Sequence, residues 1–380
     1  MSGPFVRVLP PGAVRRRQGA AAGPDPGGPW GVLAERLAPA EAGALGDRAR
    51  ALGLPAQVLD DGRAVLVRGH PEELGLLPEW LPGPLMAAVK GALGRSARRT
   101  FTLTLPGGGG LQLGGRVLVT GIVNVTPDSF SDGGRWLDPR AAVDHGLALA
   151  AEGADLLDVG GESTRPGAAP ADEAEELARV LPVIERLAAG TPVPVSVDTR
   201  RGIVAREALG AGAKLVNDVS ALADPETARA AAGAGAPVVL MHMRGTPADM
   251  RNRAVYRDVV GEVVAELHEA IRRAVALGVP EESLLVDPGI GFAKDAAQSL
   301  RLLADLPELR VLGRPILVGP SRKSFLDAVR PSEPADRLHL TLGAVAACAA
   351  AGAHVVRVHD VRPAVDVLRA FEAARGEPGS

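Results

Sequence analysis

The stretch RVLVTGIVNVTPDSFSDGG, Arg116 to Gly134, begins as a buried strand and continues as a polar loop. Its first half is β-branched and apolar apart from Asn124, which is typical of a strand covered on both faces. Thr126 to Asp128 then breaks the strand, since proline cannot continue the hydrogen-bonding ladder. The loop carries more carboxylates and hydroxyls than a simple connection needs.

Similar apolar runs recur after this stretch, separated by Ala-, Leu-, Glu- and Arg-rich segments with helical spacing. Counting gives eight strand–helix units over residues 116–374, close to the ~250 residues of a (β/α)8 barrel. A doubly wound open sheet is the alternative, but no Rossmann glycine fingerprint is present. The pattern therefore predicts an α/β protein with a TIM (β/α)8 barrel.

About 100 residues precede the strand–helix units and their hairpin, and we divide them into two regions. Residues 1–30 are rich in Pro, Gly and Arg, and we expect a mobile tail. Residues 31–100 predict a small N-terminal α/β extension of unknown role, with a helix near Leu33 to Leu52 and a hairpin turn at Asp61-Gly62. The barrel domain is expected over residues 101–376, with residues 101–115 forming a hairpin in front of the eight units.

Composition narrows the class of protein. A net charge of -3 gives no electrostatic case for binding nucleic acid or an anionic membrane. No apolar run is long enough to span a bilayer, and the single cysteine, Cys348, fits a reducing compartment. We therefore expect a cytoplasmic protein. Only four lysines and three asparagines occur, so those at strand ends stand out.

Nearly every predicted strand ends in a polar or ionisable residue. In TIM barrels these ends meet at the mouth that holds the active site. A strand-end aspartate often caps the next helix, as we expect of Asp218 and Asp360, and a lone histidine such as His242 is more often a satisfied buried residue than a ligand. The complete ring is harder to explain so simply; its members are Asn124, Asp158, Glu162, Asp198, Thr199, Asn217, Asp218, His242, Asp287, Ser321 to Lys323, Arg357, His359 and Asp360.

Two chemical sets separate within this ring. The cationic set suits a phosphate or pyrophosphate, and the acceptor set suits a ligand edge rich in N–H donors. A structural network tying the strands together is the simpler alternative. An oxygen-ligated Mg²⁺, held mainly by substrate phosphates with Asn124 as one protein ligand, is also compatible. The cationic set is Arg165, Lys323, Arg357 and His359; the acceptor set is Asp198, Asn217 and Asp287.

Ordered motifs along the chain resemble those of bacterial dihydropteroate synthases. They are GIVNVTPDSFSDGG, DVGGESTRPGA, VSVDT, VNDVS, LMHMRGTP, DPGIGFAK, GPSRKSF and RVHDV, and they span about Phe101 to Phe371. The resemblance implies a TIM barrel that condenses 7,8-dihydropterin-6-ylmethyl pyrophosphate with p-aminobenzoate and releases pyrophosphate. It also implies Mg²⁺ and, by family precedent, a homodimer.

The resemblance assigns roles by position. Asp198, Asn217, Met241, Asp287, Phe292 and Lys323 match the pterin pocket. Asn124, Arg357 and His359 match the pyrophosphate and Mg²⁺ site. Thr164 and Arg165 match active residues of the second loop. Phe130, Asp132, Pro166 and Ser321 fall around the aminobenzoate channel.

Two alternatives to a synthase remain. A pterin-binding methyltransferase would share the barrel and the acidic pocket, but it would not need TPDSFSDGG, STRPG or SRKSF. A non-catalytic pterin-binding paralogue would bind pterin without turnover. All the cationic matches are present in this sequence, so nothing in it favours a loss of activity.

Overall fold

The computed structural model of the chain describes residues 3–17, 28–126, 139–164 and 171–376. They form two compact units. The N-terminal unit extends to Arg98 and also includes Ala304–Gly313, and the second unit contains the remaining residues from Arg99. Each unit has its own sheet.

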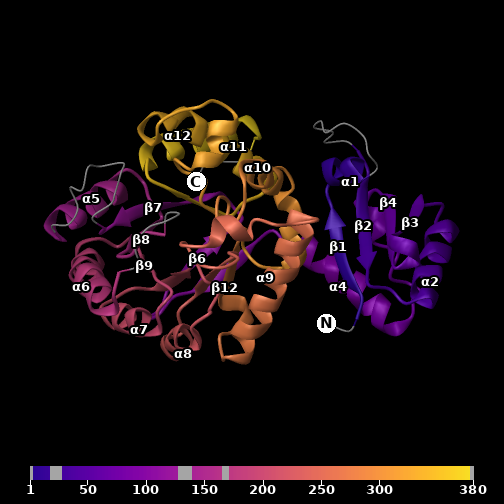
Figure 1. Cartoon of the computed structure of the whole chain (residues 1–380), viewed down its shortest axis with the longest axis horizontal. Helices are drawn as coiled ribbons and strands as arrows, with labels where there is room; N and C mark the ends of the chain where they lie inside the picture. Colours follow the sequence, from indigo (N-terminus) through magenta and orange to yellow (C-terminus); the bar gives the residue numbers. More distant parts are fainter. Residues whose placement is uncertain (1–2, 18–27, 127–138, 165–170, 377–380) are drawn as a thin grey trace. The chain divides into compact units, whose positions relative to one another are not determined.

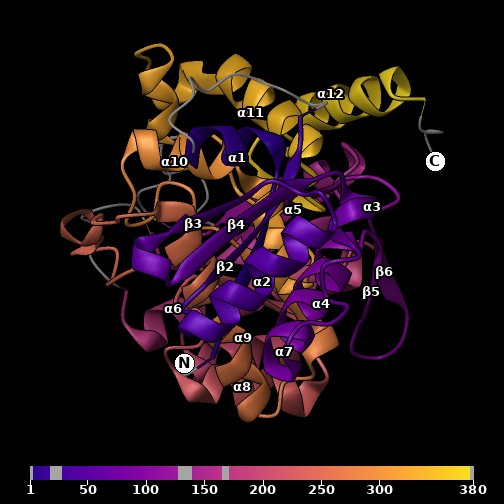
Figure 2. The ribbon, with the colours of Figure 1, turned by 90° about the vertical axis from the view of Figure 1, so that its right-hand side faces the viewer.

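The N-terminal unit is built on a four-stranded antiparallel sheet in the order β1-β2-β4-β3. Helix α2 crosses in front of these strands in Figure 2. Leu9, Leu33 and Leu66 are almost fully buried in the hydrophobic core of the N-terminal unit. The strands are β1 (Phe5–Leu9), β2 (Trp30–Glu35), β3 (Ala56–Leu59) and β4 (Ala64–Gly69), and the helices are α1 (Pro11–Arg17), α2 (Pro39–Ala51), α3 (Pro71–Leu74) and α4 (Gly83–Ala97).

Two expectations for this unit are wrong. Residues 5–17 form β1 and α1 rather than a mobile tail, because Val6, Val8 and Leu9 are buried in the sheet. The helix expected from Leu33 begins only at Pro39, since residues 30–35 pair with strands on both sides. The turn at Asp61-Gly62 is confirmed: both residues have positive φ, 50° and 86°, between antiparallel β3 and β4.

The segment 304–313, which follows helix α10 in the chain, is part of the N-terminal unit. It forms the 3-10 helix η4 (Leu306–Leu312) and contacts β1 and α4. Arg7, 1% exposed, donates to Glu308 at 3.0 Å, and Arg95 donates to the carbonyl of Val311 at 2.6 Å. The barrel sequence is therefore interrupted by a piece of the N-terminal unit, whereas the sequence analysis expected an unbroken domain over 101–376.

The second unit is a closed barrel of eight parallel strands ringed by helices (Figure 1). Strand β14 pairs with β7, and a bridge between Val286 and Ile316 joins β12 to the start of β13. The strands are β7 (Leu118–Asn124), β8 (Leu156–Gly160), β9 (Val195–Asp198), β10 (Leu215–Asp218), β11 (Val238–Met241), β12 (Leu284–Asp287), β13 (Leu317–Val318) and β14 (Val355–Val358).

Helices follow the strands in the alternation expected of a (β/α)8 barrel. Asp172 caps α6 by accepting the N–H of Glu175 at 2.7 Å, and Asp224 caps α8 by accepting the N–H of Glu226 at 2.9 Å. The helices are α5 (Pro139–Ala151), α6 (Glu173–Gly190), α7 (Gly202–Gly210), α8 (Pro225–Ala234), α9 (Val259–Ala276), α10 (Ala296–Ala304), α11 (Leu338–Ala351) and α12 (Val361–Ala374).

An apolar floor closes the N-terminal end of the barrel. The hairpin of β5 (Phe101–Thr104) and β6 (Gly110–Leu113) buries Phe101, Leu103 and Leu113 against it. Burial of this kind contributes about 1.5–3 kcal/mol for each large apolar side chain. The inward residues of the floor are Leu118, Leu156, Leu215, Val239, Leu285, Leu317 and Val355.

Candidate functional site

The polar side chains of the barrel gather above this floor, at the C-terminal ends of the strands. Register places Asn217 beside Asp198 and Met241 beside Asp287. Neighbouring residues in a parallel register lie on the same face of the sheet. These four residues of the predicted pterin pocket therefore face the barrel interior, with Met241 two positions beyond Val239, the partner of Asn217.

Arg357 joins the cationic set and the acceptor set of strand-end residues. Its Nη2 donates to Asp198 Oδ2 at 2.8 Å, and its Nε donates to Asp158 Oδ2 at 2.5 Å. Asn217 Nδ2 donates to the same Asp158 oxygen at 2.9 Å, and the hydroxyl of Ser196 donates to Asp158 Oδ1. The cationic and acceptor sets thus share one buried hydrogen-bond network.

Burial sets the protonation behaviour of this network. It raises the pKa of Asp198 to about 7, against the lowering effect of Arg357. The pKa of Asp287 is also raised by burial, which Lys323 opposes, although Asp287 accepts the N–H of Gly289 at 2.7 Å. Burial lowers the pKa of Lys323 to about 8. Perturbations of this kind are characteristic of functional sites.

Lys323 and Phe292 bring the sixth and seventh loops together. The Lys323 ammonium lies 4.5 Å from the centre of the Phe292 ring and donates to the carbonyl of Ile290 at 2.7 Å. A cation over an aromatic face is attracted by the ring quadrupole. Both residues were predicted to lie in the pterin pocket, and the structure brings them together.

Ser321 and His359 tie the seventh loop to the end of β14. Ser321 Oγ lies 2.9 Å from His359 Nδ1 and accepts the backbone N–H of His359 at 3.2 Å. Between Ser321 and Lys323, Arg322 has a φ of 54° and donates to both oxygens of Asp360, at 3.0 and 2.6 Å. Asp360 therefore anchors a loop, where the sequence analysis considered it a helix cap.

Asn124 is the last residue of β7, and Thr164 lies in the loop that follows β8. Both residues are half-buried. Neither side chain has a hydrogen-bond partner among the residues that the structure describes. Four further predicted residues, Phe130, Asp132, Arg165 and Pro166, lie outside the described residues.

Lys294 supports the sixth loop and was not predicted to have a role in the site. Its ammonium donates to His242 Nδ1 at 2.9 Å, to the carbonyl of Phe292 at 2.9 Å and to the carbonyl of His242 at 3.3 Å. His242 Nε2 lies 2.9 Å from Glu266, so this histidine is a satisfied buried residue, as the simpler reading expected. The scarcity of lysine was the signal that could have identified Lys294.

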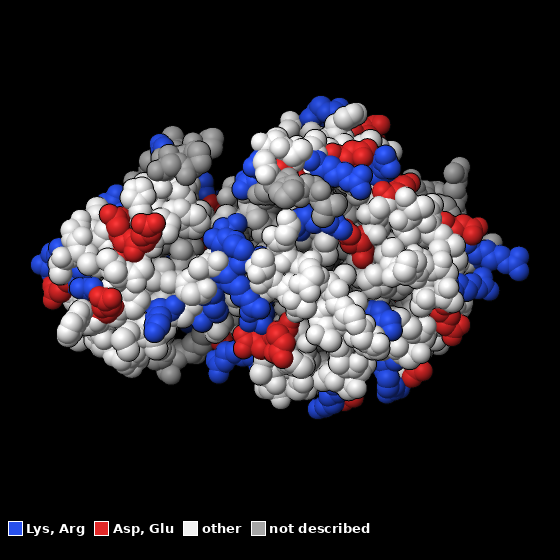
Figure 3. Space-filling view, turned by 180° about the vertical axis from the view of Figure 1, so that it is seen from behind, with Lys and Arg blue, Asp and Glu red and all other residues white. Residues whose placement is uncertain are grey.

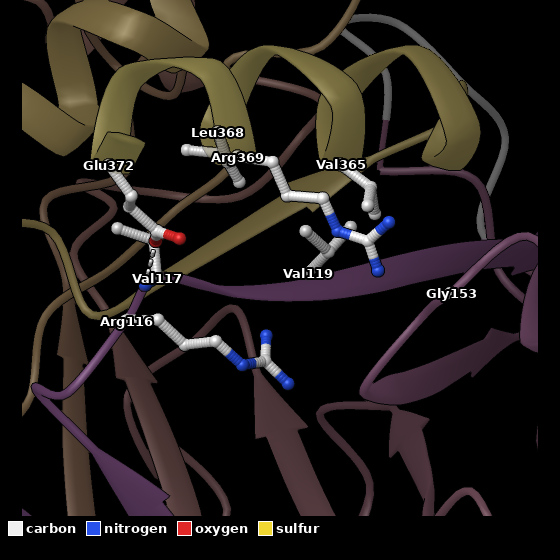
Figure 4. A pocket seen from close by; sticks show the side chains of 8 residues that line it. All are labelled: Arg116, Val117, Val119, Gly153, Val365, Leu368, Arg369 and Glu372. Carbon is white, nitrogen blue, oxygen red and sulfur yellow. Dashed lines mark hydrogen bonds between the residues drawn. The ribbon is translucent and has the colours of Figure 1, made fainter. Parts of the chain in front are cut away.

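A hollow of about 320 Å³ lies elsewhere in the barrel unit, beside the start of β7 (Figure 4). Arg116 and Arg369 line it together with Glu372 of α12, whose carboxylate accepts the N–H of Val117 at 3.1 Å. Because it lies at the N-terminal end of the strand, it is separate from the ring of strand-end residues.

The described residues contain neither a cluster of metal ligands nor a helix that could span a membrane. No three His, Cys, Asp or Glu side chains come together there as a metal-binding group. No described helix has both the length and the hydropathy needed to cross a bilayer. Acidic and basic side chains both occur on the face seen in Figure 3, with uncharged surface between them.

Comparisons with known proteins agree with this geometry. Residues 120–359 match the family described as Pterin binding enzyme. The dihydropteroate synthase of Mycobacterium leprae is 51% identical over 267 residues, which make up 68% of this chain and 93% of that protein. The family match runs from β7 to the end of β14.

Solved structures match as well. The Xanthomonas albilineans dihydropteroate synthase with 4-aminobenzoic acid is 49% identical, with a TM-score of 0.65 over 69% of this chain and 94% of that chain. A structure of the Xanthomonas albilineans enzyme with 7,8-dihydropteroate is 44% identical, with a TM-score of 0.61 over the same shares, 69% and 94%. The predicted fold and the resemblance are therefore confirmed, and the chain belongs to the dihydropteroate synthase family of pterin-binding transferases.

Proposed function

We propose that this chain condenses 7,8-dihydropterin-6-ylmethyl pyrophosphate with p-aminobenzoate, giving 7,8-dihydropteroate and pyrophosphate for folate synthesis. The observation that carries the proposal is the joined network of Asp198, Asn217 and Arg357, with Asp287 and Lys323 at the same end of the barrel. Bound 4-aminobenzoic acid and 7,8-dihydropteroate in the Xanthomonas albilineans structures support it.

The acceptor groups suit the pterin. Its amino-oxo ring presents several N–H donors, and a buried site rejects ligands that leave its own polar groups unpaired. Asp198, Asn217 and Asp287 provide the matching acceptors. Lys323, stacked on Phe292, provides a positive charge beside this pocket.

The cationic groups suit the leaving group. Negative charge develops on pyrophosphate as the C–O bond breaks, and preorganised cations stabilise that charge. We assign this role to Lys323, Arg357 and His359, with Arg165 on the second loop. The aniline nitrogen of p-aminobenzoate is a weak nucleophile that needs positioning rather than deprotonation, so no catalytic base is assigned. Thr164 is proposed, with Arg165, as an active residue of the second loop. Phe130, Asp132, Pro166 and Ser321 are proposed to line the p-aminobenzoate channel.

The described residues offer one protein ligand for a magnesium ion at this site. Mg²⁺ prefers oxygen ligands and usually keeps several waters, with one or two protein groups and substrate phosphates. The half-buried amide of Asn124, without a partner among described residues, offers one such oxygen at the end of β7. When bound, the ion would add positive charge that stabilises the departing pyrophosphate.

The assembly and location follow the same reasoning. We propose a homodimer, by the precedent of the family, and a cytoplasmic enzyme. The single cysteine, Cys348, is fully buried, and burial raises the pKa of its thiol, so it is packed and unreactive. We propose no nucleic-acid or membrane partner.

The test is pyrophosphate release by the purified chain with the pterin pyrophosphate and Mg²⁺, measured with and without p-aminobenzoate. Release should require both substrates. Lys323→Ala and Arg357→Ala should each lower kcat/KM by about 10²-fold or more, because a preorganised charge is lost. Lys90→Ala, an exposed lysine of α4, is the matched control and should change nothing.

Two outcomes would contradict the proposal. Tight pterin binding without pyrophosphate release would identify a non-catalytic paralogue. Release that does not depend on p-aminobenzoate would mean that another acceptor is used.

A further inference from the structure

Asp158, a member of the ring of strand-end residues, lies two residues before the end of β8, and none of the roles proposed above belongs to it. It is 1% exposed, so it is not a surface ligand. Its carboxylate accepts three side-chain hydrogen bonds from three other strands. The donors are Ser196 on β9, Asn217 on β10 and Arg357 on β14.

The hydrogen bond from Asn217 to Asp158 determines the orientation of the Asn217 side-chain amide. A carboxylate can only accept, so the NH₂ group of Asn217 must be the end that points at Asp158. The amide oxygen of Asn217 is then the end left over, and no described residue donates to it. Asn217 is thereby presented to a ligand as an acceptor, the polarity that the N–H edge of a pterin requires.

The bond from Arg357 settles the position of the guanidinium. Its Nε is held by Asp158 and its Nη2 by Asp198, while Nη1 makes no hydrogen bond to a described residue. A guanidinium fork held at two of its nitrogens loses little further rotamer freedom when it binds a ligand. Nη1 is the donor that stays available.

We propose that Asp158 is a positioning residue that orients Asn217 as an acceptor and Arg357 as a donor, and so selects for the pterin. This inference rests on the proposed function, because the residues that it orients are the proposed pterin contacts. Asp158 itself touches no substrate.

The test variant is Asp158→Asn, which keeps size and shape. Its amide oxygen can take the Oδ2 position and accept from Arg357 and Asn217, and its NH₂ can donate to the Ser196 hydroxyl. Without the charge the hydrogen bonds from Arg357 and Asn217 are weaker, so both side chains are held less firmly. The Kd for 7,8-dihydropterin should rise about tenfold, while the KM for p-aminobenzoate stays the same. Because a like charge is removed, the pH midpoint of pterin binding should also move to lower pH.

Asp155→Asn is the matched control. Asp155 directly precedes the same strand, is ion-paired with Arg116 and accepts the N–H of Val119 at 2.8 Å. It therefore lies at the N-terminal end of β8, away from the C-terminal strand ends that form the site. Its loss should lower the unfolding temperature without changing the Kd for dihydropterin or its pH midpoint. A merely structural ion pair at Asp158 would behave in the same way as this control.

A double-mutant cycle with Asn217→Ala separates the two roles. If Asp158 acts through Asn217, the Asn217→Ala change should raise the Kd much less in the Asp158→Asn background than in the wild type. Additive effects, or an unchanged Kd in Asp158→Asn, would overturn the inference. Should Asp158→Asn fail to fold, Ser196→Ala removes one of the three bonds and should raise the Kd about two- to threefold; no rise would overturn the inference as well.

Failure of the proposed function would look different. In that case the wild-type chain would fail to bind dihydropterin or fail to release pyrophosphate. Measuring the wild type first therefore distinguishes this failure from a failure of the inference about Asp158.

Discussion

At the scale of single residues, opposing electrostatic effects at Asp198 lead to a pH prediction. Burial raises the pKa of its carboxyl to about 7, and Asp158, Glu176 and Asp218 add to the rise, while Arg357 opposes it. Below that pH the carboxyl is protonated, so it cannot accept from the pterin with both oxygens. The Kd for 7,8-dihydropterin should therefore fall as pH rises from 5.5 to about 7, approaching tenfold per unit, and then level off.

This dihydropterin carries no phosphate, so phosphate ionisation does not contribute to the profile. The Asp198→Asn variant should bind weakly with no limb near pH 7, which isothermal titration over the same pH range would show. A wild-type Kd that is flat from pH 5.5 to 8.5 would contradict the assignment of Asp198 as a pterin acceptor.

At the scale of elements, the loop after β12 depends on one buried ammonium. Lys294 donates three hydrogen bonds to three acceptors, the full capacity of a charged lysine, although burial lowers its pKa to about 7. Nearby His242 is neutral at pH 7, since burial and Lys294 lower its pKa to about 4. The loop carries Phe292, which packs against Lys323.

Lys294→Met should leave the carbonyls of Phe292 and His242 without a donor, at a cost of about 1–3 kcal/mol for each buried group. We expect a lower unfolding temperature and a higher KM for the pterin substrate, with the KM for p-aminobenzoate little changed. Thermal unfolding and steady-state kinetics measure these effects. Lys90→Met is the control, and an equal change in both KM values would show that the loop does not act on the pterin pocket.

At the scale of the whole molecule, the N-terminal unit contains a segment that follows α10 in the barrel sequence. Leu306 and Leu309 of this segment are fully buried, and Glu308 is paired with Arg7. A chain shortened to residues 99–380 would keep the segment but lose β1 and α4, which contact it. Apolar side chains would become exposed, and Glu308 would lose its ion pair with Arg7.

We therefore predict that the shortened chain aggregates and unfolds at a lower temperature, because burial of each leucine contributes about 1.5–3 kcal/mol. Size-exclusion chromatography and thermal unfolding test this. Changing Leu306 and Leu309 to Ser in the shortened chain should restore solubility if exposure is the cause. A shortened chain as stable and monodisperse as the full one would show that the N-terminal unit is dispensable for folding.

The elements that were predicted and those that were missed differ in a physical way. The eight barrel units follow from local patterns, because each buried parallel strand is a continuous apolar run and each helix has its own period. Strand β1 was missed because its five residues lie in a Pro- and Arg-rich region and gain stability only by pairing with β2. Segment 304–313 was missed because its burial depends on residues about 300 positions earlier, such as Arg7 with Glu308.

The sequence by itself determined the barrel, the rim on which its polar residues lie and the family to which it belongs. Strand ends of a closed parallel barrel must converge, so Asp198, Asn217 and Asp287 could be grouped without coordinates. Only the tertiary structure decided that Asp158 joins Asn217 to Arg357, since this depends on strand register and side-chain rotamers across the barrel. Contacts between distant strands carry no local pattern that a single sequence can show.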